Sequence, residues 1–151
     1  DYLAFYWNRV DHWYEEDEEV FVHARSPRVR VDILDSSRPV RIELGSETVA
    51  ETSRARFLFE TNLPTRYYIP REDVSAELLP SDTQTQCPYK GVANYHSVKV
   101  GDSIHENIIW YYPDPVHESA RIKDYLCFFN EKVDAVFVDV VEQEKPKTKW
   151  S

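Results

Sequence analysis

The sequence predicts a mainly β fold built from two antiparallel sheets. Apolar and polar residues alternate in several short segments, which is the pattern of half-buried strands. Glycine-containing dipeptides lie between two pairs of these segments at hairpin spacing. The strand–helix–strand order that is typical of parallel sheets does not occur. With 151 residues, 42% of them hydrophobic and 30% charged, the chain is suited to one domain with a buried core.

The first predicted element is an amphipathic helix over residues 3–14, where apolar residues recur at spacings of three and four. The acidic run at 15–19 follows at the carboxyl end, where the helix dipole disfavours negative charge, so we expect it to end the helix and stay in water. A cation site made of these carboxylates is the less favoured alternative. We therefore divide the chain into an N-terminal helical and acidic segment (1–19), a β domain (20–145) and a polar tail (146–151).

Short strands follow the acidic run. Gly45-Ser46 and Gly101-Asp102 are suited to two-residue turns, because glycine adopts the positive φ that such turns require. The predicted strands cover residues 20–22 and 28–33, and the predicted hairpins cover residues 40–51 and 96–107.

Prolines and polar clusters separate the remaining elements. Pro70 ends one strand and begins a short helix, while Pro113 and Pro115 end a buried strand. The expected elements are strands at 56–60, 65–70 and 108–112, a helix at 71–79, a loop at 81–86, and a last pair of strands at 124–129 and 133–140 around residues 130–132.

Composition restricts the classes of function. A net charge of −9 argues against nucleic acid as the main partner, because phosphate binding relies on clustered Lys and Arg. We find no run of about twenty apolar residues, and so expect no membrane partner. Two cysteines are too few for a disulfide scaffold, which favours a reducing, cytoplasmic location. The five histidines lack the paired spacing of metal sites, so we expect no metal and no cofactor. Since the chain starts at Asp1 and has no Met, we expect it to be part of a longer protein.

Residues 86–91, QCPYKG, place a thiol, a phenol and an amine close together. A nucleophilic cysteine requires a stabilised thiolate, for which Lys90 supplies a nearby cation, and His96 is a candidate base. The segment also has the composition of a turn, with Pro88 at a corner and Gly91 at a position of positive φ. Both interpretations stay open at the level of sequence, and the turn is favoured.

The other candidate residues are aromatic and polar side chains near strand ends. Tyr and Trp combine apolar area with a polar group, and Arg presents a planar fork suited to carboxylates, so the set predicts a small-molecule pocket. Alternation along each strand places about half of the aromatic residues in the core. The candidate ligand-binding residues are Arg66, Tyr68, Arg71, Tyr89, Tyr95, Trp110 and Tyr112, and the candidate catalytic residues are Cys87, Lys90 and Glu131.

Four segments, LPTRYYIPREDV, CPYKGVANYHSVKVGD, WYYPDP and FFNEKVD, together resemble the domain of unknown function 427 family, which also carries a nucleotidyltransferase-like label. The resemblance covers roughly residues 20–145 and implies a β-tent-like domain, with two antiparallel sheets at a steep angle. Related tent folds often carry a zinc clasp, for which this sequence lacks the cysteine pairs. The family's recurrent positions correspond to Arg66, Tyr68, Arg71, Cys87, Tyr89, Lys90, Gly91, Tyr95, Trp110, Tyr112, Pro113 and Glu131.

Three functional hypotheses follow. The first is a domain that binds an anionic or carbonyl-bearing small molecule in an aromatic cleft between the two sheets. The second is an enzyme in which Cys87 or Lys90 is the nucleophile and Glu131 or His96 transfers protons. The third is an interaction module that uses a sheet edge or the acidic run to contact a protein partner or a second copy of the chain.

Overall fold

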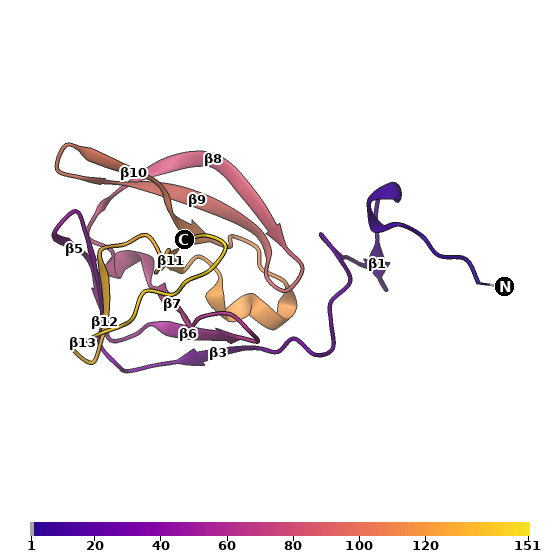
Figure 1. The fold of residues 1–151 in the computed structure, drawn as a ribbon, viewed down its shortest axis with the longest axis horizontal. Coiled ribbons are helices and arrows are strands. Elements are labelled where there is room, and N and C mark those ends of the chain that lie inside the picture. The colour runs from indigo at the N-terminus through magenta and orange to yellow at the C-terminus, as the bar shows by residue number, and fades with distance from the viewer. Residues whose placement is uncertain (1) are drawn as a thin grey trace.

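The computed structural model describes residues 2–151 and confirms a mainly β architecture of antiparallel sheets with few helices (Figure 1). Three short 3₁₀ helices accompany the strands: η1 (Trp7–Arg9), η2 (Arg71–Asp73) and η3 (His117–Ile122). The strands are β1 (Tyr14–Glu15), β2 (Glu18–Glu19), β3 (Val31–Asp35), β4 (Val40–Leu44), β5 (Glu47–Thr52), β6 (Arg56–Glu60), β7 (Arg66–Ile69), β8 (Glu77–Cys87), β9 (Gly91–Val100), β10 (Ser103–Tyr111), β11 (Leu126–Phe128), β12 (Ala135–Val138) and β13 (Val141–Glu142).

Two sheets form the body of the domain. The seven-stranded sheet has the order β3-β6-β7-β11-β10-β9-β8, and the four-stranded sheet has the order β13-β12-β4-β5. In the view of Figure 1, β3 and β6 lie at the bottom, β8 to β10 at the top, and the four-stranded sheet at the left. The C-terminus lies between the top and bottom strands in this view, and the N-terminal arm extends away to the right.

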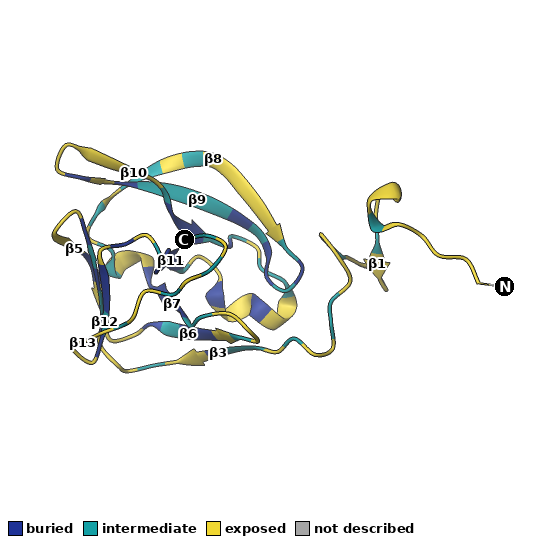
Figure 2. Cartoon of the chain, viewed as in Figure 1, coloured by how far each residue is buried: buried dark blue, intermediate teal, exposed yellow. Residues whose placement is uncertain are grey.

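The two sheets share one hydrophobic core (Figure 2). Ile69, Ile109 and Phe128 contribute to it from the seven-stranded sheet. Ile42 and Leu44 contribute from the four-stranded sheet, and each of these five side chains is at most 1% exposed. Since side chains alternate along a strand, the opposite face of the seven-stranded sheet carries a second set of side chains, several of which are also buried.

Both predicted hairpins are confirmed. Gly45 and Ser46 join β4 to β5 with φ values of 61° and 64°, the pair of positive angles that a primed two-residue turn requires. Gly101, with φ of 53°, turns β9 into β10. The predicted strand at 56–60 coincides with β6, and β7 lies within the predicted 65–70.

The predicted helix at 3–14 is wrong. Only Trp7–Arg9 is helical, as one 3₁₀ turn, and the acidic run forms the end of β1, the turn and β2 of a short hairpin. Tyr2, Leu3 and Tyr6 remain 80–103% exposed. An isolated helix of this length is marginal in water, so an apolar face without a surface to pack against does not hold it together.

Strand pairing overrides two further predictions. The helix expected at 71–79 is reduced to η2, and β8 runs from Glu77 through the expected loop at 81–86. Its partner is β9 on both sides of a register shift between Pro80 and Gln84. A strand bulge therefore accommodates the polar residues that suggested a loop.

The strand expected at 20–22 is also absent, and Val22 has a φ of 68°.

The segments predicted as a last pair of strands, 124–129 and 133–140, contain β11 and β12, which do not pair with each other, and this corrects another prediction. β11 lies between β7 and β10 in the seven-stranded sheet, whereas β12 lies between β4 and β13. The apolar pattern of both segments is satisfied because each is central in its own sheet.

None of the helices among residues 2–151 has the length and apolar character needed to cross a bilayer.

Candidate functional site

Strand register places most of the candidate residues on one face of the seven-stranded sheet. Tyr68 pairs with Cys127, Cys127 with Trp110, and Trp110 with Tyr95, so these side chains share a face. Arg66 pairs with Leu58 on the same face. The face that these residues form is opposite the one that carries Ile69, Ile109 and Phe128.

This face lines a pocket of about 800 Å³. Its walls come from the seven-stranded sheet, from the loop at 22–23 and from the tail at 147–150, and the four-stranded sheet contributes no lining residue among those described. The cleft is therefore formed by one curved sheet and not, as predicted, between two sheets. The predicted residues that line it are Arg66, Tyr68, Cys87, Tyr89, Lys90, Tyr95, Trp110 and Tyr112.

Aromatic rings form the inner wall of the pocket. Trp110 Nε1 donates a hydrogen bond of 3.1 Å to the buried hydroxyl of Tyr68, and the two rings meet edge to face. Phe129 lies against Trp110 with ring centroids 4.5 Å apart and is roughly parallel to Tyr95. The Tyr95 hydroxyl is 2.9 Å from Thr85 Oγ1. These contacts fix the rings in a rigid wall.

A buried ion pair supports this wall. Both terminal nitrogens of Arg66 donate to the carboxylate oxygens of Glu131 at 2.7 Å, and the Glu131 side chain is 0% exposed. The Arg66 guanidinium lies 5.3 Å from the Trp110 ring centroid and 5.7 Å from that of Trp150. Glu131 therefore lies behind Arg66 and is not among the residues that line the pocket.

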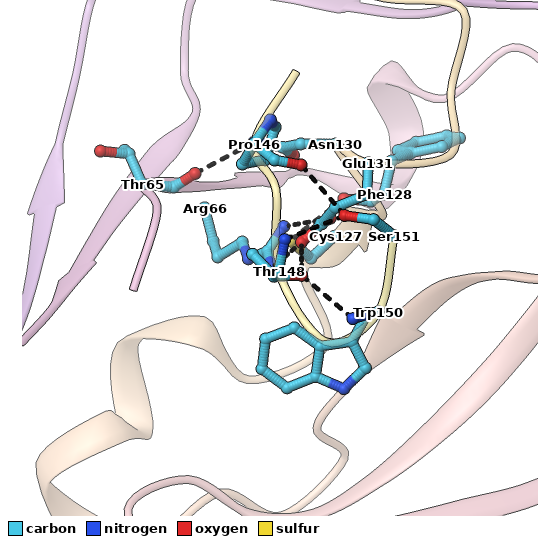
Figure 3. Close-up of polar contacts among 10 residues, drawn as sticks. All are labelled: Thr65, Arg66, Cys127, Phe128, Asn130, Glu131, Pro146, Thr148, Trp150 and Ser151. Atoms are coloured by element: carbon cyan, nitrogen blue, oxygen red, sulfur yellow. Dashed lines mark hydrogen bonds and ion pairs between the residues drawn. The ribbon is translucent and has the colours of Figure 1, made fainter. Parts of the chain in front are cut away.

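The polar tail docks against this pair. Thr148 Oγ1 donates to Glu131 Oε1 at 2.7 Å. Figure 3 shows Thr148 beside Arg66 and Glu131, with the Trp150 ring on the same turn of the chain. Hydrogen bonds of Ser151 to Thr148 and to the Pro146 carbonyl close that turn. The tail therefore forms part of the pocket wall, which sequence composition alone did not predict.

A second ion pair is formed by two residues that line the pocket. Lys90 Nζ pairs with Glu60, and the two side chains are 10% and 8% exposed. An ammonium in an ion pair has no lone pair for nucleophilic attack, so this geometry favours a binding role for Lys90. Glu60 is a site residue that our sequence analysis missed. The only signal for it was alternation along RFLFE, which places Glu60 on the same face as Leu58.

The QCPYKG segment is the turn between β8 and β9. Cys87 pairs with Gly91, and the Lys90 amide donates to the Cys87 carbonyl at 3.2 Å. Gly91 has a φ of 102°. Tyr89 is held by its hydroxyl, which accepts a hydrogen bond from the Ser26 amide at 2.9 Å. The segment is therefore a turn, and Cys87 and Lys90 on it line the pocket.

Two further candidates, Arg71 and His96, do not line the pocket. Arg71 donates to His96 Nε2 at 3.1 Å, and the His96 ring stacks on Tyr111 with centroids 4.8 Å apart. Since Tyr95 lines the pocket, its neighbour His96 faces the other side of β9. The structure therefore does not bring His96 to Cys87. Within residues 2–151, no three side chains of His, Cys, Asp or Glu gather as a metal site would require.

A comparison with protein families identifies the family of the chain. The family described as Domain of unknown function (DUF427) matches residues 32–139, a span that includes both sheets except β13. The chain belongs to the DUF427 family. No curated protein matches the chain. In this DUF427 domain the matched span holds the turn and the aromatic wall, while the tail at 147–150 lies beyond it.

Acid should weaken the stabilisation that Glu131 gives to this DUF427 domain. Burial opposes ionisation of Glu131, but hydrogen bonds from Arg66 and Thr148 outweigh it and hold the pKa of Glu131 below its usual value of about 4.3. A lowered pKa in the folded state stabilises the fold at neutral pH, and this contribution is lost as pH falls through the folded pKa. We expect the difference in unfolding free energy between wild type and Glu131→Gln to shrink from pH 6 to pH 3 in urea titrations. A difference that stays constant over this range would contradict the assignment.

Proposed function

We propose that this DUF427 domain binds a small anionic molecule with a planar apolar body in the pocket of the seven-stranded sheet. The observation that carries the proposal is the combination of volume and lining. A volume of about 800 Å³ is within the range of small-molecule sites, and the lining combines an aromatic wall with a few polar groups.

The charge of the lining supports an anionic ligand. The chain has a net charge of −9, yet four cationic side chains and one carboxylate line the pocket. Glu131 neutralises the cation of Arg66 from behind. The excess positive charge comes mainly from the exposed Lys147 and Lys149 at the mouth, where it would attract an anion from solution.

The aromatic wall supports a planar body. Trp110 and Phe129 present fixed ring surfaces, and Trp150 adds a further ring from the tail. Rings that are already ordered lose little conformational entropy when a flat ligand stacks on them, so they favour binding. Our enzymatic alternative has less support, because His96 is remote from Cys87 and Glu131 is engaged by Arg66 and Thr148.

The test uses anilinonaphthalene sulfonate, a fluorescent aromatic anion, as the probe. We expect saturable binding to the native protein at low salt. In the variant Lys147→Glu/Lys149→Glu, both changed side chains are exposed, and the affinity should fall roughly tenfold because two attractive charges become repulsive. Added salt should reduce this difference.

A matched control carries the same change in net charge far from the pocket lining. Arg9 and Lys99 are both exposed and do not line the pocket, and Lys99 lies at the end of β9 that is remote from the QCPYKG turn, so Arg9→Glu/Lys99→Glu should bind the probe nearly as well as wild type. Equal affinities of the two double variants, or the absence of saturable binding to the native protein, would rule out the proposed site.

A further inference from the structure

One tyrosine of the pocket has an unused hydrogen-bonding group. Tyr112 is 4% exposed and lines the pocket, and its hydroxyl makes no hydrogen bond to another described residue. Among the described side chains, the polar atoms that are both fully enclosed and without a hydrogen bond are His96 Nδ1 and His105 Nε2. The Tyr112 hydroxyl is not one of them, so it is not fully enclosed and keeps contact with the pocket space. A buried hydroxyl without a partner is costly, which leaves the pocket contents to supply its acceptor.

Lys90 contributes further donors to the same pocket. Its ammonium carries three N–H groups, and Glu60 is its one acceptor among the described residues. The backbone on either side is fixed, because the Val116 amide donates to the Lys90 carbonyl at 3.1 Å and the Lys90 amide donates to Cys87. The remaining donors of this nearly buried ammonium are therefore held in place.

Cys87 belongs to the same turn as Lys90, whose backbone amide donates to the Cys87 carbonyl. Cys87 is half-buried at the end of β8, and it lines the pocket together with Lys90 and Tyr112. The pKa of Tyr112 is raised well above its usual value, mainly because the phenol is buried and secondly because Cys87 lies near it. The phenol consequently remains a hydrogen-bond donor at neutral pH.

We infer that Tyr112 and Lys90 form a carboxylate subsite beside the Cys87 thiol. The phenol and the ammonium donate to the oxygens of the carboxylate, and the body of the ligand extends toward Tyr95 and Trp110. The inference rests on the proposed function and specifies it, since it assigns the ligand to the organic carboxylic acids and places its acid group at the β8–β9 turn.

Cys87 itself provides the probe for this subsite. Iodoacetate and iodoacetamide alkylate a thiolate by the same displacement, in which the sulfur forms a bond to the methylene carbon and iodide leaves, but only iodoacetate carries a carboxylate. The measured quantity is the ratio of the alkylation rates of Cys87 with iodoacetate and with iodoacetamide. We expect this ratio to be about tenfold higher in the native than in the denatured protein, because charge-assisted hydrogen bonds position iodoacetate. The reaction of native Cys87 with iodoacetate should also show saturation kinetics. Peptide mass spectrometry separates Cys87 from Cys127, which is buried.

Two neighbouring tyrosines give a matched pair of variants. Tyr112→Phe removes the proposed donor and should abolish the preference for iodoacetate. Tyr111→Phe removes a hydroxyl from the opposite face of the sheet, where Tyr111 stacks on His96, and should leave the preference unchanged. In wild-type protein, sodium acetate should slow alkylation of Cys87 by iodoacetamide more than sodium chloride does at equal ionic strength.

The outcomes separate this inference from the proposed function. Alkylation ratios that are equal in native and denatured protein, or a preference that survives in Tyr112→Phe, would overturn the subsite. Saturable binding of anilinonaphthalene sulfonate alongside such a result would leave the pocket intact and move the acid group elsewhere. The acetate competition needs no variant, so a folding defect in Tyr112→Phe would not prevent a decision.

Discussion

Replacing Glu131 with Ala is expected to lower the free energy of unfolding by about 3–5 kcal/mol, because it leaves the guanidinium of Arg66 buried without its partner. Both side chains of this pair are almost inaccessible to water, and two hydrogen bonds of 2.7 Å join them. The variant also removes the acceptor of Thr148, so the tail should detach. Urea denaturation followed by far-ultraviolet circular dichroism measures the loss of stability, and hydrogen exchange of residues 147–150 measures the detachment.

An exposed ion pair provides the control for this prediction. Arg30 and Asp32 are 2.9 Å apart, with side chains that are 82% and 38% exposed, and Asp32→Ala should cost less than about 1 kcal/mol. The double variant Arg66→Met/Glu131→Leu should recover much of the stability, because it removes both buried charges together. A loss in Glu131→Ala no larger than in Asp32→Ala would mean that the pair does not support the wall of the pocket.

Gly91→Ala is expected to lower the free energy of unfolding by about 3 kcal/mol or more. Gly91 has a φ of 102°, which residues with a side chain rarely adopt, and an added Cβ would lie 3.2 Å from the carbonyl oxygen of Asp114. The strain would also displace Lys90 and Cys87, so alkylation of Cys87 should lose its preference for iodoacetate. Chemical denaturation and the alkylation assay report the two effects.

Gly101 separates the effect of backbone angle from that of crowding. It has a φ of 53°, and an added Cβ would meet nothing within 4 Å. Gly101→Ala should therefore lower the free energy of unfolding by about 1 kcal/mol, which is the cost of a left-handed backbone conformation in a residue whose side chain meets no neighbour. Equal losses of unfolding free energy in Gly91→Ala and Gly101→Ala would show that the close approach of the segment at 114–116 does not constrain the turn at Gly91.

The sequence identified many residues of the pocket but could not assign their faces. Tyr67-Tyr68 and Tyr111-Tyr112 are adjacent pairs of like chemistry, and composition does not distinguish the members. Pairing of Tyr68 with Cys127 decides the first pair. Arg71 was placed with the ligand-binding residues because of its chemistry, yet its contacts are with His96 and Tyr111 outside the pocket.

Local patterns along the chain determined the β class, the β4–β5 and β9–β10 hairpins and the turn at QCPYKG, because glycine and proline restrict the backbone within a few residues. Only the tertiary structure decided which sheet β11 and β12 join, since both are apolar segments that either sheet could bury. It also decided the charge pairs, because Glu60, Glu131 and Thr148 lie 17 to 65 residues from their partners. A short sequence pattern carries no information on such distant contacts, which depend on register and on the curvature of the whole sheet.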